Sequence, residues 1–182
     1  MDKKISIIAA LAEDYTIGEK GKIPWNIPED RKRFRELTMN KPVIMGRTTF
    51  ESILERIRKP LEGRTNIVLT RNAKYSSADG IKIAHSIQEA LELANQEALE
   101  LAGEVAEVFI AGGEQVYKTG IEIATDMYLT HVSGFFPNGD AHFPKFEKEK
   151  WKEVWREDHN TLEEQKKHGL VYSFIDYRRK NI

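Results

Sequence analysis

Hydrophobic residues along the chain fall into short runs that alternate with amphipathic stretches. Short apolar runs rich in β-branched residues predict buried strands, and apolar residues that recur every three or four positions predict helices. The predicted strands are residues 5–12, 43–45, 66–70, 81–84, 108–111 and 127–132. The predicted helices are residues 28–39, 49–56, 87–102 and 114–124.

Two later segments, Trp151–His159 and Val171–Arg178, alternate apolar and polar residues as an antiparallel pair does. Together with the alternation of strands and helices, they predict an α/β fold with a mixed, mainly parallel sheet. No Pro/Gly/Ser-rich linker divides the chain, so we expect a single domain over residues 1–182. The sequence EALELA occurs at Glu89–Ala94 and again at Glu97–Ala102. Its two copies share nearly one helical face and predict one longer helix, not a repeat architecture.

Composition excludes several kinds of site. The 182 residues include no cysteine, which rules out disulfides and thiolate chemistry. A net charge of -1 and dispersed basic residues argue against a nucleic-acid partner, and the five histidines show no metal-binding spacing. No apolar run approaches the roughly 20 residues that span a membrane, and no cleavage site follows the first apolar stretch. We therefore expect a cytoplasmic protein that binds neither metal nor membrane.

An acid occupies an unusual position in the segment KIPWNIPEDRKRFRELTMNKP. Pro28 suits the first turn of a helix, and Asp30 then lies on the same face as Phe34 and Leu37, which is the face that turns to the core. An apolar surround would raise the pKa of Asp30, while the helix N-terminus would lower it. A solvated acid of the first turn is the ordinary explanation, but Trp25 and Phe34 nearby favour a buried carboxylate that binds a ligand with paired donors.

Two strand–helix turns have the residues expected of a phosphate site. Gly112 and Gly113 follow the apolar run VFIA, where glycine lets a ligand approach the backbone, although a tight turn alone would also explain the pair. Gly46 and Arg47 follow the run PVIM, and we expect Thr48 and Thr49 to open the next helix. Arg71 follows another strand, so that it and Arg47 could clamp one phosphate. The Rossmann pattern G-x-G-x-x-G is absent.

These segments together closely resemble the dihydrofolate reductase family in its bacterial form. The resemblance runs in order through SIIAALAED, IGEKGKIPWNIPED, KPVIMGRTTFESI, PLEGRTNIVLTR, FIAGGEQVY, MYLTHV and GDAHFP. It implies an eight-stranded sheet flanked by helices. It also implies NADPH-dependent reduction of 7,8-dihydrofolate to 5,6,7,8-tetrahydrofolate, with hydride transfer from nicotinamide C4 to pterin C6 and protonation of N5. Such a protein supports one-carbon metabolism and is an antifolate target.

The resemblance also assigns site residues. Asp30 would bind the pterin, Thr130 would support it, and Trp25 would help to hold a water near the acid. The implied substrate contacts are Ile8, Ala10, Asp30, Arg31, Phe34, Thr49, Ile53, Arg64, Ala111, Tyr117 and Thr130. The implied NADPH contacts are Ala10, Ile17, Gly18, Gly46, Arg47, Thr48, Thr49, Leu69, Thr70, Arg71, His85, Gly112, Gly113, Glu114, Gln115, Val116 and Tyr117. The Gly112–Gly113 bond is expected to be cis.

Some residues leave alternatives open. Glu13–Asn26 resembles a mobile loop that closes over the nicotinamide, and Asp140 resembles a residue that holds it closed, although a simple turn also explains Asp140. Arg31 breaks the family pattern, which commonly has an apolar residue there. It could bind a folate carboxylate or pair on the surface with a neighbour such as Glu29.

Other activities compatible with the sequence are a pyrimidine reductase of riboflavin biosynthesis and a noncatalytic NADP-binding module. The motif PWNIPED argues against the first, and the intact acid, threonine and glycine pair argue against the second. We expect a monomer.

Overall fold

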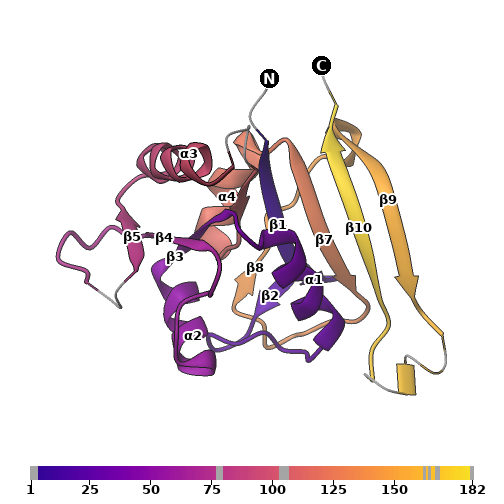
Figure 1. Cartoon of the computed structure of the whole chain (residues 1–182). Coiled ribbons are helices and arrows are strands. Elements are labelled where there is room, and N and C mark those ends of the chain that lie inside the picture. The colour runs from indigo at the N-terminus through magenta and orange to yellow at the C-terminus, as the bar shows by residue number, and fades with distance from the viewer. Residues whose placement is uncertain are drawn as a thin grey trace.

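Eight strands form one sheet in the computed structural model, which describes residues 4–76, 80–102, 107–161, 163, 165–166 and 169–180. The strand order is β5-β4-β3-β6-β1-β7-β10-β9 (Figure 1). Neighbouring strands from β5 through β7 are parallel, and β10 is antiparallel to both β7 and β9. The strands are β1 (Ile5–Ala12), β3 (Pro42–Gly46), β4 (Thr65–Leu69), β5 (Ile81–Ala84), β6 (Val108–Ile110), β7 (Asp126–Val132), β9 (Trp151–His159) and β10 (Tyr172–Arg179). The predicted mixed α/β sheet is confirmed.

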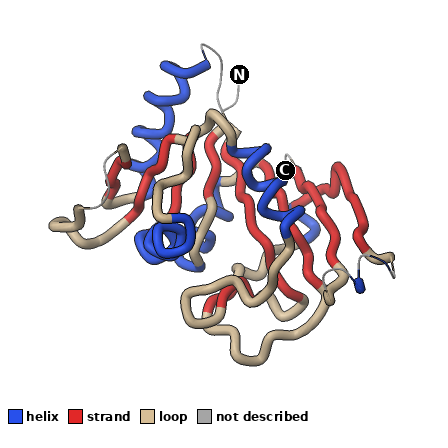
Figure 2. Tube along the Cα trace, turned by 60° about the horizontal axis from the view of Figure 1, so that its bottom comes forward, coloured by secondary structure: helices blue, strands red, loops and turns tan. Residues whose placement is uncertain are grey.

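Helices cover both faces of this sheet, as Figure 2 shows. They are α1 (Pro28–Thr38), α2 (Arg47–Ile57), α3 (Ile87–Ala102) and α4 (Glu114–Ile123). Strand residues such as Ile44 and Ile110 pack with α3 and α4, whereas Met45 and Phe109 pack on the other face, where α1 and α2 lie. This division follows from strand geometry, because successive side chains leave opposite faces.

The structure corrects three details of the prediction. Helix α2 begins at Arg47, because Gly46 takes the extended conformation of an N-cap, so Thr48 and Thr49 lie inside the helix. The segment Glu13–Asn26, expected as a mobile loop, contains the strand β2 (Thr16–Gly18), which pairs with β8 (Ala141–His142). A short 3₁₀ turn, η1 (Lys148–Lys150), precedes β9.

The EALELA repeat does lie in one helix, α3, with Ala90 and Ala94 fully buried. The side chains of residues 98–102, in the second copy, lie outside the described part of the chain. None of the helices in the described ranges is long and apolar enough to cross a membrane.

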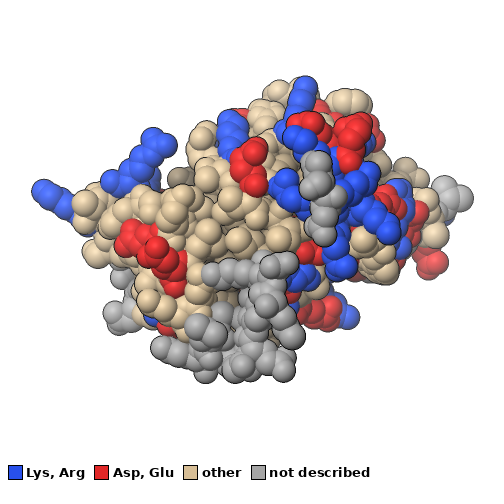
Figure 3. All heavy atoms as spheres, turned by 90° about the horizontal axis from the view of Figure 1, so that it is seen from above, with Lys and Arg blue, Asp and Glu red and all other residues tan. Residues whose placement is uncertain are grey.

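Charged residues of both signs are mixed on the face at the amino ends of the parallel strands (Figure 3). Glu107 lies there between Lys4 and Lys41, each with its ammonium 2.8 Å from the carboxylate. Asp126 accepts a bond from Arg178 at 3.2 Å on the same edge. These ion pairs occupy the amino ends, and the predicted site residues lie at the carboxyl ends, the usual location of ligands in α/β sheets.

Candidate active site

Asp30 in the first turn of α1 contacts Thr130 of β7, although the two lie 100 positions apart in sequence. The threonine hydroxyl donates to Asp30 Oδ1 at 2.5 Å. Burial raises the pKa of the Asp30 carboxyl, while the hydrogen bond from Thr130 and the charges of Arg33 and Arg31 act in the opposite direction. The result is a partly buried acid, held in one orientation by a hydroxyl and able to accept further hydrogen bonds.

The indole of Trp25 lies in the apolar cluster next to this acid. It packs edge-on against Phe136 at 5.0 Å between ring centroids, and only 9% of the residue is exposed. Its Nε1 is buried and has no hydrogen-bond partner within the described residues. A buried indole N–H usually finds a partner, so this donor fits the predicted contact with a water near Asp30.

Tyr117 of α4 is attached to β1 by its hydroxyl, which donates to the carbonyl oxygen of Ile8 at 2.8 Å. Burial and the nearby charge of Asp30 raise the pKa of this tyrosine above its usual range. The phenol is therefore a neutral donor at physiological pH. Tyr117 was predicted to touch both substrate and cofactor, and in the structure it holds the backbone carbonyl of Ile8, a residue that the resemblance assigns to the substrate.

The predicted walls of the ring-binding site come from several elements. Phe34, Ile53 and Ala111 are partly buried and pack around a cluster that includes Ile8. Ala10 lies instead in the cluster that contains Trp25. The structure thus brings apolar side chains from α1, α2 and the end of β6 together on the face of the sheet that carries Asp30.

Arg64 lies between α1 and β4, beside a cation that sequence reasoning missed. Its Nη1 points to the sulfur of Met39 at 3.9 Å, and its buried Nε has no hydrogen-bond partner in the described chain. Burial and the charge of Arg35 lower the pKa of Arg64. Arg35 escaped notice because α1 contains four basic residues, and only the fold shows which one lies near Arg64. An anion between the two arginines would relieve their repulsion.

Arg31 is exposed, and its Nη1 donates to Asn26 Oδ1 at 2.5 Å. Its hydrogen-bond partner is thus the last residue of the segment Glu13–Asn26, not the neighbour Glu29 suggested by the sequence. The guanidinium remains accessible to a ligand at the surface.

The two glycine-containing turns pack directly against each other. The Gly112–Gly113 peptide bond is cis, as expected, and the Gly46 N–H donates to the Gly112 carbonyl at 2.7 Å. A Cβ on Gly113 would lie 3.1 Å from the hydroxyl of Thr49, and one on Gly46 would lie 3.2 Å from Val116. Both glycines are N-caps, of α2 and α4, without a side-chain cap. Two helix N-termini with close backbone approach fit the phosphates of NADPH.

Arg71 and His85 lie just beyond the ends of the adjacent strands β4 and β5. The His85 ring is 2.9 Å from the carbonyl oxygen of Thr70, the residue before Arg71. Arg47 forms an ion pair at 2.9 Å with Glu51, one turn further along α2. The backbone bond of Thr70 to the His85 ring places the next residue, Arg71, on the strand end adjacent to His85, while Arg47 would have to leave its partner to reach a phosphate.

The remaining predicted cofactor residues are spread over four places at the same end of the sheet. Ile17 and Gly18 lie on β2, Leu69 ends β4, Thr48 lies in α2, and Glu114, Gln115 and Val116 open α4. Glu114 also accepts a hydrogen bond from Lys118 at 2.6 Å and one from the His142 N–H at 3.0 Å, which links α4 to β8.

Hydrogen bonds from the loop before β8 and from α2 hold the middle of the predicted lid segment Glu13–Asn26. The Lys20 N–H donates to Asp140 Oδ2 at 2.8 Å, and the Asp140 N–H donates to the Gly18 carbonyl at 3.0 Å. The hydroxyl of Ser52 in α2 donates to the Gly21 carbonyl at 2.9 Å. Asp140 therefore does more than close a turn, because its side chain holds the segment from a distant loop. No group of three His, Asp or Glu side chains in the described residues could hold a metal.

Comparisons with known proteins show what the whole chain is similar to. The family model "Dihydrofolate reductase" matches residues 4–179. A dihydrofolate reductase of Neisseria meningitidis serogroup A is 41% identical over 176 residues, covering 97% of this chain and 98% of the relative. Dihydrofolate reductase type 3 of Salmonella typhimurium is 40% identical over 155 residues, covering 85% and 87%. The solved dihydrofolate reductase of Enterococcus faecalis, complexed with NADP(H) and RAB-propyl, has a TM-score of 0.82 at 31% identity and covers 98% of this chain and 97% of that one.

Proposed function

Because this chain belongs to the dihydrofolate reductase family, we propose that it reduces 7,8-dihydrofolate at the group of residues around Asp30. The protein is an oxidoreductase of folate metabolism that uses NADPH. The observation that carries the assignment of the site is the 2.5 Å bond from Thr130, which orients a partly buried acid beside apolar walls. Such an acid suits a flat heterocycle with paired N–H donors, as a pterin has.

Each residue has a distinct part in the proposed mechanism. NADPH, when bound, supplies the hydride that reaches pterin C6. Asp30 accepts hydrogen bonds from N3 and the 2-amino group, fixing the ring and placing negative charge where it raises the basicity of N5. Thr130 holds the carboxylate, and Trp25 Nε1 supplies a donor for a nearby water. Water gives N5 its proton, so Asp30 orients and stabilises without itself delivering the proton.

Arg64 and Arg35 define the proposed end of the substrate that carries the glutamate. Two guanidinium groups, one of them partly buried, suit a carboxylate better than a neutral group. Arg31 is proposed to bind a further glutamate carboxylate by exchanging its bond to Asn26 for one to the substrate. Arg31→Leu should then raise KM for polyglutamylated dihydrofolate more than for the monoglutamate, and equal changes would place Arg31 outside the site.

Oxidation of NADPH by the purified protein tests the activity. We expect turnover with dihydrofolate and none with the ribosylated pyrimidine of riboflavin biosynthesis. Turnover with the pyrimidine alone would support that alternative, and cofactor binding without turnover would support a noncatalytic module. The relatives found are dihydrofolate reductases, which favours the first outcome.

The single domain, the monomeric state, the cytoplasmic location and the lack of a nucleic-acid partner remain proposals. Sedimentation of the purified protein tests whether it is a monomer, and cell fractionation tests its location. A binding assay with nucleic acid at low salt tests whether it lacks such a partner.

A further inference from the structure

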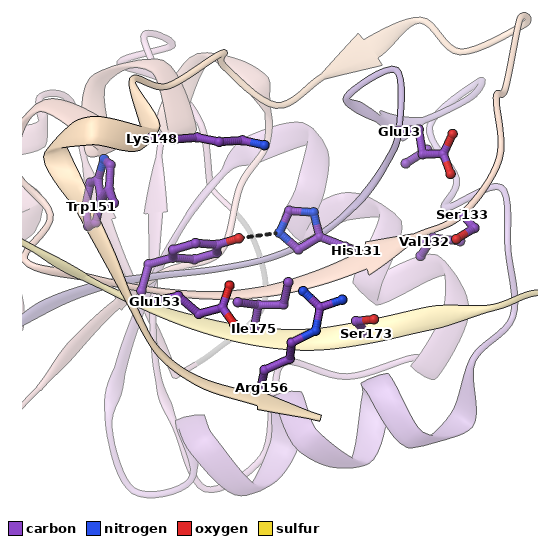
Figure 4. Close-up of a pocket in the computed structure, with 12 residues that line it drawn as sticks. Glu13, His131, Val132, Ser133, Lys148, Trp151, Glu153, Arg156, Ser173 and Ile175 are labelled. Atoms are coloured by element: carbon purple, nitrogen blue, oxygen red, sulfur yellow. Dashed lines mark hydrogen bonds between the residues drawn. The ribbon is translucent and has the colours of Figure 1, made fainter. Parts of the chain in front are cut away.

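A pocket of about 510 Å³ opens on the face of the sheet opposite Asp30. Residues of β7, β9 and β10 line it, together with η1 and the end of β1 (Figure 4). Thr130 and His131 are neighbours in β7, so their side chains leave opposite faces of the sheet. Thr130 binds Asp30, while His131 lines the pocket, which is therefore separated from the proposed active site by the sheet itself.

Two cations converge on His131 from different elements. Lys148 of η1 and Arg156 of β9 both point toward the imidazole in Figure 4. Arg156 binds Asp158 through Nε at 2.7 Å, and its guanidinium end is directed into the pocket. Within the described chain, Lys148 has no carboxylate at ion-pair distance. Burial and the charges of Lys148 and Arg156 lower the pKa of His131 to about 4.

The acidic residues of the pocket do not offset the positive charge around His131. Glu13 and Glu153 also line it, but neither contributes to the shifted pKa of His131. Burial and the charge of Glu153 raise the pKa of Tyr177 to about 12. The electrostatic potential is thus positive at the imidazole, and the carboxylates make other parts of the pocket unfavourable for an anion.

The rest of the lining consists of apolar side chains, two serines and Tyr177. The side chains of Ile175 and Trp151 form part of the wall, and the Tyr177 hydroxyl lies 3.3 Å from His131 Nε2, which orients the ring. We propose that this pocket binds a small organic anion, with its carboxylate or phosphate between Lys148, Arg156 and His131 and its apolar part against Ile175 and Trp151. A few convergent polar groups beside apolar walls are typical of small-ligand sites.

Binding should depend on pH in a defined direction. The charged and titratable groups that line the pocket around the His131 ring are Glu13, Lys148, Glu153, Arg156 and Tyr177. An anion held by the two cations cancels their effect and raises the pKa of His131 from about 4. Formation of the complex therefore takes up protons. The affinity for the anion increases as the pH falls toward the pKa of His131 in the complex.

Benzoate is a suitable probe, because it joins a carboxylate to an apolar ring. The imidazole NMR signals of His131, assigned with His131→Gln, would be followed during titration at pH 7.5 and pH 5.5. NADP⁺ and dihydrofolate are kept saturating so that benzoate cannot occupy the proposed active site. Acetate and inorganic phosphate test whether an anionic group binds without an apolar ring, and benzyl alcohol tests whether the ring binds without an anionic group.

We expect a saturable shift with benzoate that is tighter at pH 5.5, and weaker binding of every other probe. Lys148→Ala should weaken benzoate binding about fivefold or more, the loss of one charge-assisted contact. Lys145→Ala, which removes an exposed cation nearby that does not line the pocket, should have no effect. Absence of a saturable shift, equal losses in the two lysine variants, or equal binding of benzyl alcohol would overturn the proposal.

Discussion

At the scale of single residues, the position of Asp30 could be predicted from sequence, but its surroundings could not. Helical spacing placed the acid on the apolar face of α1, and the fold shows that Thr130 reaches it from β7. The partner was inferred by resemblance, because nothing local links residues 100 positions apart. The hydrogen bond of Tyr117 to Ile8 and the repulsion between Arg35 and Arg64 have no sequence signature and depend entirely on tertiary packing.

Asp30→Asn should leave the fold intact and lower kcat/KM for dihydrofolate by about a hundredfold or more at neutral pH. An amide can accept a bond from Thr130 but cannot place negative charge beside the pterin. Steady-state rates measured with NADPH, and circular dichroism for the fold, check this. Glu36→Gln, at an exposed acid of the same helix, is the matched control. A folded Asp30→Asn variant within a few-fold of wild type would remove Asp30 from the mechanism.

Arg71→Ala should weaken NADPH binding more than Arg47→Ala, while NADH binding changes little in either variant. Arg71 follows Thr70, whose carbonyl oxygen lies 2.9 Å from the His85 ring, and is proposed to meet the 2′-phosphate, whereas Arg47 must first give up its 2.9 Å ion pair with Glu51. We expect a loss of about tenfold or more for Arg71→Ala, the usual effect of one charge-assisted bond. Fluorescence titration with both cofactors measures it, with Arg56→Ala as the control. Equal losses for NADPH and NADH would show that these arginines do not read the phosphate.

At the scale of elements, long strands and helices could be predicted and short ones could not. The apolar runs of β1 and β5 are long enough to show a period, and their bounds agree with prediction. β2 and β8 contain three and two residues, too few for any pattern, and exist because they pair with each other. The start of α2 was placed too late because Gly46 caps the helix through its backbone, without a side-chain signal.

Asp140→Ala should slow hydride transfer by about tenfold, because it removes the carboxylate that accepts the Lys20 N–H and so favours open forms of the lid. Stopped-flow measurement of a single turnover isolates that step from product release. Lys20→Ala is an informative control, since the bond uses the backbone N–H and should survive loss of the side chain. If both variants were equally slow, the carboxylate would have no special part in holding the lid.

At the scale of the whole molecule, one sheet supports two different surfaces. Its strands alternate residues between the face with α1 and Asp30 and the face with α3, α4 and the pocket at His131. Sequence periodicity predicts that two faces exist. It does not predict that η1 and β9 bring Lys148 and Arg156 over the same imidazole, because that depends on how the last antiparallel strands turn against β7.

Acid stability provides a test of that arrangement in the whole protein. In the unfolded chain His131 should titrate near its usual pKa of 6.5, whereas in the fold the pKa is about 4. Because the pKa of His131 is lower in the fold, the unfolded chain takes up a proton at a higher pH than the folded protein does. The contribution of His131 to the free energy of unfolding is therefore greatest above pH 6.5 and falls as the pH drops toward 4. The shift corresponds to a loss of about 3 kcal/mol in the free energy of unfolding across that interval.

His131→Gln should therefore lose less stability than wild type between pH 7 and pH 4.5, in urea unfolding at constant ionic strength. The variant cannot take up this proton, and its glutamine can still lie beside the Tyr177 hydroxyl. His142→Gln, at an exposed histidine, should keep the wild-type pH dependence. Parallel stability curves for wild type and His131→Gln would mean that His131 titrates alike in both states. In that case Lys148 and Arg156 would not impose a positive potential on the pocket.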